Sequence, residues 1–246
     1  MIRVRIIRAR GSTPREEGAE MMVGRDTVTG TIGGGQLEYL AIDRARMMLA
    51  KGETQARMDV PLGPDIGQCC GGRVELALDR ARATVPVPGP AILIFGAGHV
   101  GRALARALLP LPFSPRLIDQ RAAELSLAAP GVPTTLTPLP EAELRAAPPG
   151  AAVVIVTHDH ALDFLLGVEA LARPDAPYIG MVGSRTKRAT FDRFARSHGA
   201  DPARLVCPIA AGFPRDKRPE VIAAFTAAEI AARLLTHAPA PALHAP

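Results

Sequence analysis

Two adjacent cysteines, Cys69 and Cys70, carry the most distinctive reactive chemistry in this 246-residue chain. They stand in the sequence GQCCGG (67–72), together with Gln68, and the flanking glycines leave both sulfur atoms mobile and approachable. Adjacent thiols can bind a soft metal, form a vicinal disulfide or carry sulfane sulfur as a persulfide. The alternative is an accidental pair in a glycine hairpin. Zinc is disfavoured, because zinc ligands come as separated pairs and Cys207 is the only other thiol.

A glycine motif, GAGHVG (96–101), follows the apolar run Ala91–Phe95 and opens a helix-like segment. Gly96 lets the chain turn tightly, Gly98 lets the backbone approach a pyrophosphate, and Gly101 lets helix and strand pack closely. The helix N-terminus, at His99, offers free N–H groups to an anion. This pattern predicts a Rossmann-like fold.

Asp119 ends the next apolar run, about 20 residues beyond the glycines, where an acidic side chain can accept a hydrogen bond from a ribose hydroxyl. NAD(P) or another nucleotide is therefore one candidate ligand. The alternative is that the turn serves only packing or another ligand, because fold alone does not determine function.

Polar residues also follow two later apolar runs. His158 and His160 come after 151–156, and Ser184, Arg185 and Lys187 come after 178–182. Residues just past parallel strands face the crevice where ligands bind, so these are candidate site residues. For the histidine segment, the alternative is loop and capping hydrogen bonds by its neighbours Thr157 and Asp159.

Three cations, Arg185, Lys187 and Arg188, stand beside a predicted helix start that Ser184 is suited to cap. Together they could hold a phosphate group. The alternative is that Lys187 and Arg188 are simply solvated.

The first part of the chain contains a second glycine run, Gly33, Gly34 and Gly35, at a strand-to-helix junction. Glycines in this position favour an anion-cradling turn. A glycine- and proline-containing loop, 11–19, precedes it and includes Ser12 and Arg15.

Periodicity and turn signals predict the elements that position these residues. In the first half we expect strands at 3–9, 21–23, 28–32 and 73–78 and a helix at 36–50. In the second half we expect strands at 91–95, 116–118, 151–156, 178–182 and 205–207, and helices at about 99–109, 161–171, 185–197 and 219–235. The segment VPVPGP (85–90) is typical of a linker.

The predicted fold class is therefore α/β, with a small N-terminal α+β domain (1–84) followed by a Rossmann-like parallel-sheet domain (91–236). The tail 237–246 is expected to be disordered.

Composition limits the class of protein. A net charge of +5 is modest, and 4% aromatic residues with no tryptophan leave little for a base-stacking platform, so a nucleic-acid partner is not expected. Three cysteines do not form a disulfide framework of the secreted kind. The N-terminus lacks the apolar core of a signal peptide, and no run approaches membrane-spanning length. We expect a cytoplasmic protein without a membrane partner.

Several blocks in fixed order resemble the XdhC/CoxI family of molybdenum hydroxylase maturation factors, and the XdhC branch most closely. They cover residues 8–235 and read GSTPREEGAEMMV, TGTIGGGQLE, GQCCGG, FGAGHVGRAL, THDHALD, YIGMVGSRTKR and CPI…KRPEVIAA. The resemblance implies a chaperone, not a turnover enzyme. Such proteins bind the molybdenum cofactor, shield it during sulfuration by a cysteine desulfurase and pass it to the molybdenum subunit of xanthine dehydrogenase.

The resemblance also implies candidate contacts and partners. Cys69 and Cys70 would contact molybdenum or sulfur, and Ser12, Arg15 and the turn 33–35 would cradle the pterin or its phosphate. We expect these residues and the GAGHVG turn to share a cleft. Cofactor biosynthesis proteins and a second copy of the chain, as a homodimer, are further expected partners. Family members usually carry a helix before the first strand; if this start is genuine, a partner or second subunit would cover the exposed layer.

Two other classes of function stay open. An NAD(P)-dependent oxidoreductase would use His158 or His160 as acid–base catalyst. A redox or scaffold module would cycle Cys69 and Cys70 between thiols and a disulfide.

Overall fold

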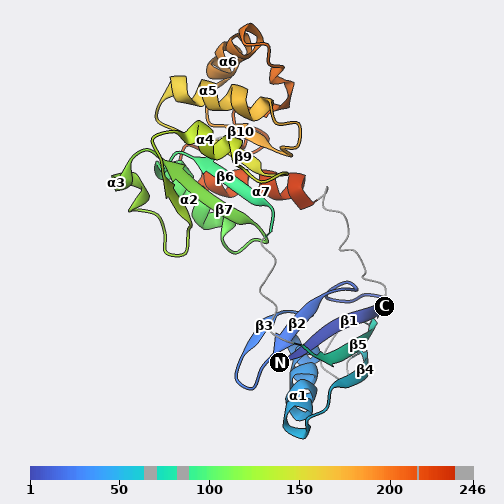
Figure 1. Ribbon diagram of the computed structural model, residues 1–246. Helices are drawn as coiled ribbons and strands as arrows, with labels where there is room; N and C mark the ends of the chain where they lie inside the picture. Colours follow the sequence, from blue (N-terminus) through green and yellow to red (C-terminus); the bar gives the residue numbers. More distant parts are fainter. Residues whose placement is uncertain (64–70, 82–88, 215, 236–246) are drawn as a thin grey trace. The chain divides into compact units, whose positions relative to one another are not determined.

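The computed structural model describes residues 1–63, 71–81, 89–214 and 216–235, and divides into two compact units on either side of residue 87. We call them the N-terminal unit and the Rossmann unit and describe each by itself (Figure 1). Most of the predicted linker 85–90, and the tail 237–246, lie outside the described residues.

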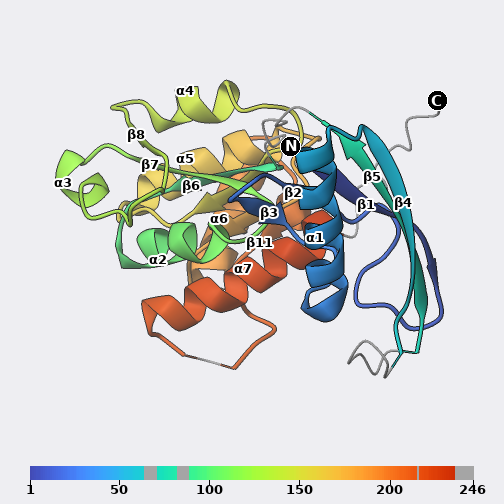
Figure 2. The same ribbon diagram turned by 90° about the horizontal axis from the view of Figure 1, so that it is seen from below.

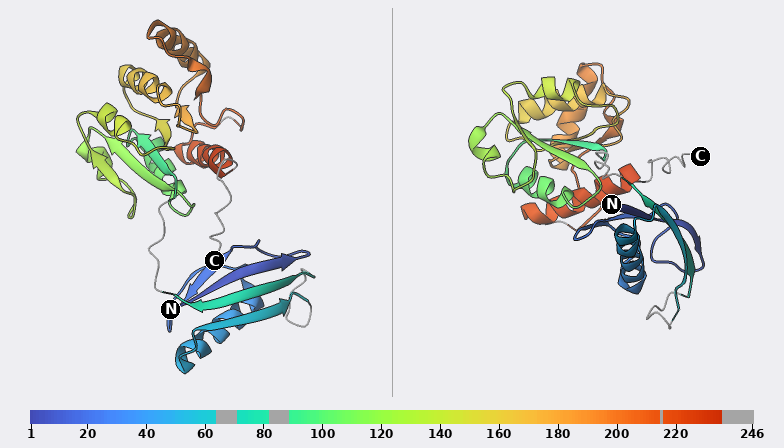
Figure 3. Two further views of the ribbon diagram at one scale, coloured as in Figure 1. Left: turned by 45° about the vertical axis from the view of Figure 1, so that its right-hand side comes forward. Right: turned by 60° about the horizontal axis from the view of Figure 1, so that its bottom comes forward.

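The N-terminal unit is an antiparallel sheet with one long helix on one face (Figure 3). Its elements are β1 (Ile2–Arg10), β2 (Glu20–Val23), β3 (Val28–Gly30), α1 (Gly35–Lys51), β4 (Gln55–Pro61) and β5 (Arg73–Arg80), and the strand order is β3-β2-β1-β5-β4. Residues alternate along β1, so Ile2, Val4 and Ile6 are fully buried with Leu37 and Met48 of α1. The other face of β1 carries the arginines, and Arg3 pairs with Asp79 at 2.8 Å.

The Rossmann unit is a six-stranded parallel sheet between two helical layers. Its strands are β6 (Ala91–Phe95), β7 (Ser114–Asp119), β8 (Thr134–Leu136), β9 (Ala152–Ile155), β10 (Ile179–Met181) and β11 (Leu205–Val206). Its helices are α2 (His99–Leu108), α3 (Ala122–Leu125), α4 (Pro140–Arg145), α5 (His160–Leu171), α6 (Arg185–Ser197) and α7 (Pro219–Leu235), with a 3-10 turn at Pro202–Arg204. Figure 2 shows α2 and α7 on one side of this sheet and α4 and α5 on the other.

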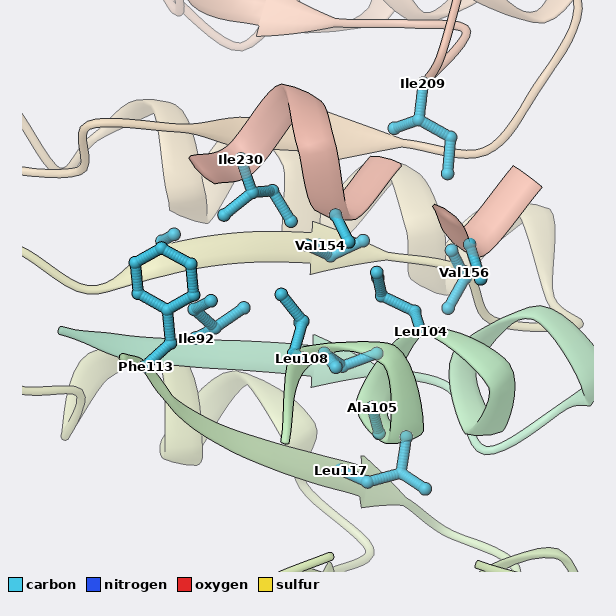
Figure 4. Packing of buried hydrophobic residues seen from close by; sticks show 14 of the residues in the cluster. Ile92, Leu104, Ala105, Leu108, Phe113, Leu117, Val154, Val156, Ile209 and Ile230 are labelled. Carbon is cyan, nitrogen blue, oxygen red and sulfur yellow. The ribbon is translucent and has the colours of Figure 1, made fainter. Parts of the chain in front are cut away.

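Two cores hold this unit together because alternate residues of a buried strand face opposite layers. Ile92 and Val154 face Leu104 and Leu108 of α2 and Ile230 of α7 (Figure 4). The residues between them, such as Leu93 and Val153, pack instead against α4, α5 and α6.

The strand order β11-β10-β9-β6-β7-β8 places the first strand of the unit, β6, next to β9. All six strands are parallel, but β6, β7 and β8 follow one another toward one edge of the sheet, and β9, β10 and β11 toward the other. In open α/β sheets the ligand crevice forms where the strand order switches in this way, outside the carboxyl ends of the strands. The predicted fold class is confirmed, and the GAGHVG turn stands at this point.

Several predicted elements match closely, including β6 and α7, whose bounds are the predicted ones. The sequence analysis missed β4, β8, α3 and α4. The last three fall in a segment, 120–150, that is rich in proline and alanine, and they are only three to six residues long. Among the described residues, no helix has both the length and the apolar character needed to cross a membrane.

Candidate functional site

Two glycines of the GAGHVG turn are required by the packing of the turn itself. Gly96 has φ of 112°, a left-handed value that favours glycine, and a Cβ there would overlap the backbone of Val156. A Cβ on Gly101 would overlap the carbonyl oxygen of Gly96. Close packing of helix on strand, predicted for Gly101, is therefore what the structure has.

Gly98 is different, because no close contact within the described residues requires a glycine there. Its φ of −65° suits any residue, and a Cβ would meet no atom within 4 Å. It borders a cavity of about 370 Å³ that is also lined by His99, Arg121, Thr157 and His158. No side chain caps α2, which begins at this point. The open space beside Gly98 is therefore the part of the turn that a ligand could use.

The backbone of Ala97, the residue before Gly98, is held on both sides. The N–H of Ala97 donates to Oδ2 of Asp119 at 2.6 Å, and the carbonyl oxygen of Ala97 accepts from the guanidinium of Arg102. Arg102 is in turn paired with Glu124. Side chains from α2, β7 and α3 thus fix the shape of the turn.

Asp119 ends β7 beside the turn, as predicted, but its carboxylate is occupied. Besides Ala97, it accepts from the backbone N–H of Arg121 at 2.9 Å, from Nε of Arg121 at 3.0 Å and from Nη2 of Arg121 at 2.9 Å. Burial alone would raise the pKa of Asp119, but the hydrogen bonds from Arg121 and Ala97 hold that pKa below its ordinary value. A ribose hydroxyl would have to displace Arg121 to reach it.

The two histidines after β9 lie at the carboxyl end of the parallel strands. His158 is exposed and lines the cavity beside Gly98. His160 is exposed and begins α5. Their neighbour Asp159 caps α5 by accepting from the N–H groups of Ala161 and Leu162, which is the capping role considered for this segment.

The basic segment after β10 is mostly structural. Ser184 caps α6 by accepting from the N–H of Lys187, as predicted. The ammonium of Lys187 is paired with the buried carboxylate of Asp163 and donates to the carbonyl oxygen of Val182 at 2.9 Å. Arg188 bonds Asp192 and two carbonyl oxygens. The alternative that Lys187 and Arg188 are solvated is wrong, and Arg185 alone of the three cations is exposed.

Asp163 was not among the predicted site residues, although it links the segments at the carboxyl ends of two strands. Its Oδ1 accepts from the N–H of Thr157 at 3.2 Å and from the Thr157 hydroxyl at 2.7 Å, while Oδ2 faces Lys187. It therefore ties together the segments that follow β9 and β10. The signal that could have found it is a lone acidic residue within the otherwise apolar segment 161–168 of α5.

In the N-terminal unit, the loop 11–19 contacts both the 33–35 turn and Gly72. A Cβ on Gly33 would lie 2.5 Å from Cγ of Pro14, which places the 33–35 turn against the loop of Ser12 and Arg15. A Cβ on Gly72 would overlap the carbonyl oxygen of Ser12. Both Ser12 and Arg15 are exposed. The structure thus brings Ser12, Arg15 and the 33–35 turn together.

The 33–35 turn is, however, filled by the protein's own carboxylate. Glu38, in the first turn of α1, accepts from the N–H groups of Ile32 and Gly34, each at 2.9 Å, and from the hydroxyl of Thr31. Burial alone would raise the pKa of Glu38, but these hydrogen bonds hold it below its ordinary value. Of the amide groups predicted to cradle an external anion, that of Gly34 is engaged by Glu38 and that of Gly33 donates to the hydroxyl of Thr31 at 3.2 Å.

Gln68, Cys69 and Cys70 lie outside the described residues, in the segment between β4 and β5. The two strands pair antiparallel, and the N–H of Gly71 donates to the carbonyl oxygen of Leu62 at 2.8 Å. Within the described residues, no group of three or more His, Cys, Asp or Glu side chains could hold a metal ion. The half-buried Cys207 lies in the Rossmann unit, and burial raises the pKa of its thiol.

The candidate residues therefore form two groups. One comprises Ser12, Arg15 and Gly33–Gly35 in the N-terminal unit. The other, in the Rossmann unit, comprises Gly98, His99, Arg121 and His158 around the cavity, with Gly96, Gly101 and Asp119 shaping it. Ser184 and Lys187 do not line the cavity: Ser184 caps α6, and Lys187 is paired with Asp163. A cleft shared by both groups stays a prediction.

Comparisons with known proteins cover both units. The model of the XdhC Rossmann domain matches residues 92–230, and the model of the XdhC and CoxI family matches residues 1–60. The uncharacterized Escherichia coli K12 protein YqeB is 29% identical over 238 residues, which cover 92% of this chain and 42% of YqeB. The chain thus spans less than half the length of that relative.

A solved structure has the same fold. It is a Bacillus halodurans protein described as a xanthine dehydrogenase, with a TM-score of 0.82 and 18% sequence identity, over 98% of this chain and 94% of that one.

Proposed function

The chain belongs to the XdhC and CoxI family, and from this premise we propose that it is a maturation factor for a xanthine dehydrogenase. It binds the molybdenum cofactor, protects it while a molybdenum oxo ligand is replaced by sulfur, and passes it to the molybdenum subunit of the target enzyme. The chain itself turns over no substrate in this proposal. A cysteine desulfurase, cofactor biosynthesis proteins and a second copy of the chain are its further partners.

The contacts of the loop 11–19 with the 33–35 turn and with Gly72 are the observation that carries the proposal. The loop with Ser12 and Arg15 contacts both the 33–35 turn and Gly72, which follows the two cysteines in sequence. A phosphate-bearing pterin needs hydrogen-bond donors, and a molybdenum centre is suited to soft thiolate ligands. This region of the sequence supplies both kinds of group.

The residues fit the cofactor unequally. Arg15 is exposed, and no hydrogen bond or ion pair engages its side chain within the described part of the chain, so its guanidinium can donate to a phosphate. The hydroxyl of Ser12 can donate beside it. Glu38 already accepts from Gly34, so the 33–35 turn shapes the site instead of binding phosphate through that amide. The cofactor, when bound, supplies the metal that receives sulfur.

Retention of the cofactor tests the proposal. The full chain is purified from hosts with and without molybdopterin synthesis. Its mass is measured by native mass spectrometry, and a second sample is oxidised with acid and iodine. We expect a fluorescent pterin and the matching added mass only from the competent host. Cys69→Ala, Cys70→Ala and Arg15→Ala should each lower the amount of pterin per chain.

Matched controls separate these roles from general effects. Cys207→Ser changes the half-buried thiol of the other unit, and Arg25→Ala removes an exposed arginine from the turn between β2 and β3; both should retain pterin as the unmodified chain does. A chain that carries no pterin from the competent host contradicts the proposal. Retention and target activation at the unmodified level in both cysteine variants and in the double variant contradict the thiol role.

A second candidate function, an NAD(P)-dependent oxidoreductase, is favoured by the position of His158 on the cavity beside Gly98. In that case His158 acts as the acid–base group next to a bound nicotinamide. Hydride transfer to a small carbonyl substrate, lost in His158→Ala and kept in His198→Ala, would support it. Saturable nucleotide binding without any hydride transfer would exclude it.

A further inference from the structure

The hydrogen bonds at the end of β7 decide which kind of ligand the cavity of the Rossmann unit can receive. An ionised carboxylate offers about four acceptor positions. The four donors on Asp119 come from Ala97 and from three nitrogens of Arg121, two on each oxygen. The Asp119 side chain is only 5% exposed. Asp119 therefore has no acceptor position left for a ribose hydroxyl.

Arg121 has donors to spare. A guanidinium carries five N–H groups, and the hydrogen bonds from Nε and Nη2 to Asp119 use one group each. Within the described part of the chain, Nη1 makes no hydrogen bond: it lies 4.0 Å from Oε1 of Glu124, which is beyond hydrogen-bond distance. The Arg121 side chain is 34% exposed and lines the cavity with Gly98 and His99.

Two carboxylates and two guanidinium groups lie at or beside the cavity, so net charge does not decide which ligand it prefers. The balance of free hydrogen-bond donors and acceptors does. Glu124 also lines the cavity, but its carboxylate is paired with Arg102, and Asp119 is paired with Arg121. Within the described residues, the groups left unengaged are the remaining donors on Arg121, the uncapped first turn of α2 across the same cavity, and one acceptor, Oε1 of Glu124. Donors on this surface therefore outnumber acceptors. A ligand that brings acceptors suits this surface better than one that brings hydroxyl donors.

We propose that this cavity binds an adenine dinucleotide whose ribose carries a 2′-phosphate, with Arg121 on that phosphate and the pyrophosphate beside Gly98. In the Rossmann arrangement the pyrophosphate lies at the first helix, and the adenosine ribose lies at the end of the second strand, which is β7 here. A free 2′,3′-diol finds no acceptor on Asp119, whereas a phosphomonoester finds a positioned guanidinium. The site does not depend on the pterin proposal, because it lies in the other unit.

Calorimetric titration of the full chain with four probes tests this specificity. The probes are adenosine 2′,5′-bisphosphate, 5′-AMP, NADP⁺ and NAD⁺. We expect the 2′-phosphorylated probe of each pair to bind at least tenfold more tightly than its partner. Arg121→Gln should reduce that ratio to within about twofold, chiefly by weakening the 2′-phosphorylated probes.

Two further variants keep the test decisive. Arg116→Gln, an exposed arginine on the same strand that does not line the cavity, should leave the ratio unchanged. Gly98→Val places a side chain where an added Cβ meets no described atom, so the chain should still unfold cooperatively, with circular dichroism like that of the unmodified chain, and bind all four probes at least tenfold more weakly. This variant tests the site even if Arg121→Gln destabilises the turn.

Equal binding of the paired probes, tighter binding of NAD⁺, or no binding of any probe at millimolar concentration would overturn the proposal. Loss of pterin retention would not, since that result concerns Ser12, Arg15 and the cysteines. A chain that retains pterin and ignores all four nucleotides would keep the proposed function and refute this inference.

Discussion

Two glycine runs, each between a strand and a helix, give opposite results in this molecule. In the N-terminal unit the turn before α1 is closed by Glu38, whose carboxylate accepts from Ile32, Gly34 and Thr31. In the Rossmann unit the turn before α2 has no side-chain cap, and Gly98 faces open space.

The difference teaches that glycine spacing alone does not identify an anion site. Glycines permit the backbone to present its N–H groups, and what those groups receive depends on the nearest carboxylate. Near α1 the carboxylate is in the first turn of the helix. Near α2 the carboxylate, Asp119, holds Ala97 and leaves the following residues free to face the cavity.

The largest effect is expected at Gly101. Gly101→Ala forces a Cβ against the carbonyl oxygen of Gly96, and we expect destabilisation of about 3 kcal/mol, at the upper end for overpacking. Denaturant unfolding followed by circular dichroism measures it. Ala103→Gly, on the next turn of α2, is a control for helix propensity and should cost only about 1 kcal/mol. A Gly101→Ala chain as stable as the unmodified one would show that helix and turn are not in close contact.

Removing the internal carboxylate comes next. Glu38→Ala leaves the N–H groups of Ile32 and Gly34 without their acceptor, and we expect a loss of about 1–3 kcal/mol in unfolding free energy. Asp43→Ala, an exposed acidic residue further along α1, should change stability by less than about 0.5 kcal/mol. If the two variants lose equally little, Glu38 does not hold the turn.

The pH dependence of that carboxylate gives a smaller effect. The folded chain lowers the pKa of Glu38 below its ordinary value of 4.5, so the unfolded state binds the proton more readily. The contribution of Glu38 is therefore complete above about pH 4.5 and is lost as the pH falls through the lowered pKa. The stability difference between the unmodified chain and Glu38→Gln should shrink between pH 6 and pH 3. A difference that stays constant or grows on acidification contradicts the assigned hydrogen bonds.

The smallest effect is expected at Gly98. Gly98→Ala adds a Cβ that meets no described atom, at a backbone angle that alanine adopts freely. The entropic gain from alanine and its poorer fit at the N-cap of α2 oppose each other, so stability should change by less than about 1 kcal/mol. Thermal unfolding beside Gly101→Ala makes the comparison directly. A marked destabilisation would mean that Gly98 serves packing, as Gly96 and Gly101 do.

The Rossmann unit was the more predictable part because its signals are local. The apolar run of β6 and the proline that begins α7 lie within the elements they define. β4 was missed although its sequence alternates: Ala56, Met58 and Val60 face the core between exposed polar residues, and this period of two could have identified the strand. The short β8, α3 and α4 depend on packing against β7 and α5, which no local pattern encodes.

The candidate site was less predictable because partners distant in sequence decide it. The ion pair of Lys187 with Asp163 spans 24 residues, and it turns a predicted phosphate ligand into a structural group. Glu38 could have been found, since an acidic residue in the first turn of a helix is a recognised start signal. That Asp119 would be saturated by Arg121, two residues away, depends on side-chain orientations that spacing does not specify.

The two hydrogen bonds on the backbone of Ala97 affect how fast a ligand can bind. Because the N–H of Ala97 donates to Asp119 and its carbonyl oxygen accepts from Arg102, we expect this part of the cavity rim to keep its shape when a ligand binds. A visiting molecule then meets a surface that needs no rearrangement, and its rate of capture depends on diffusion and charge, not on a conformational step.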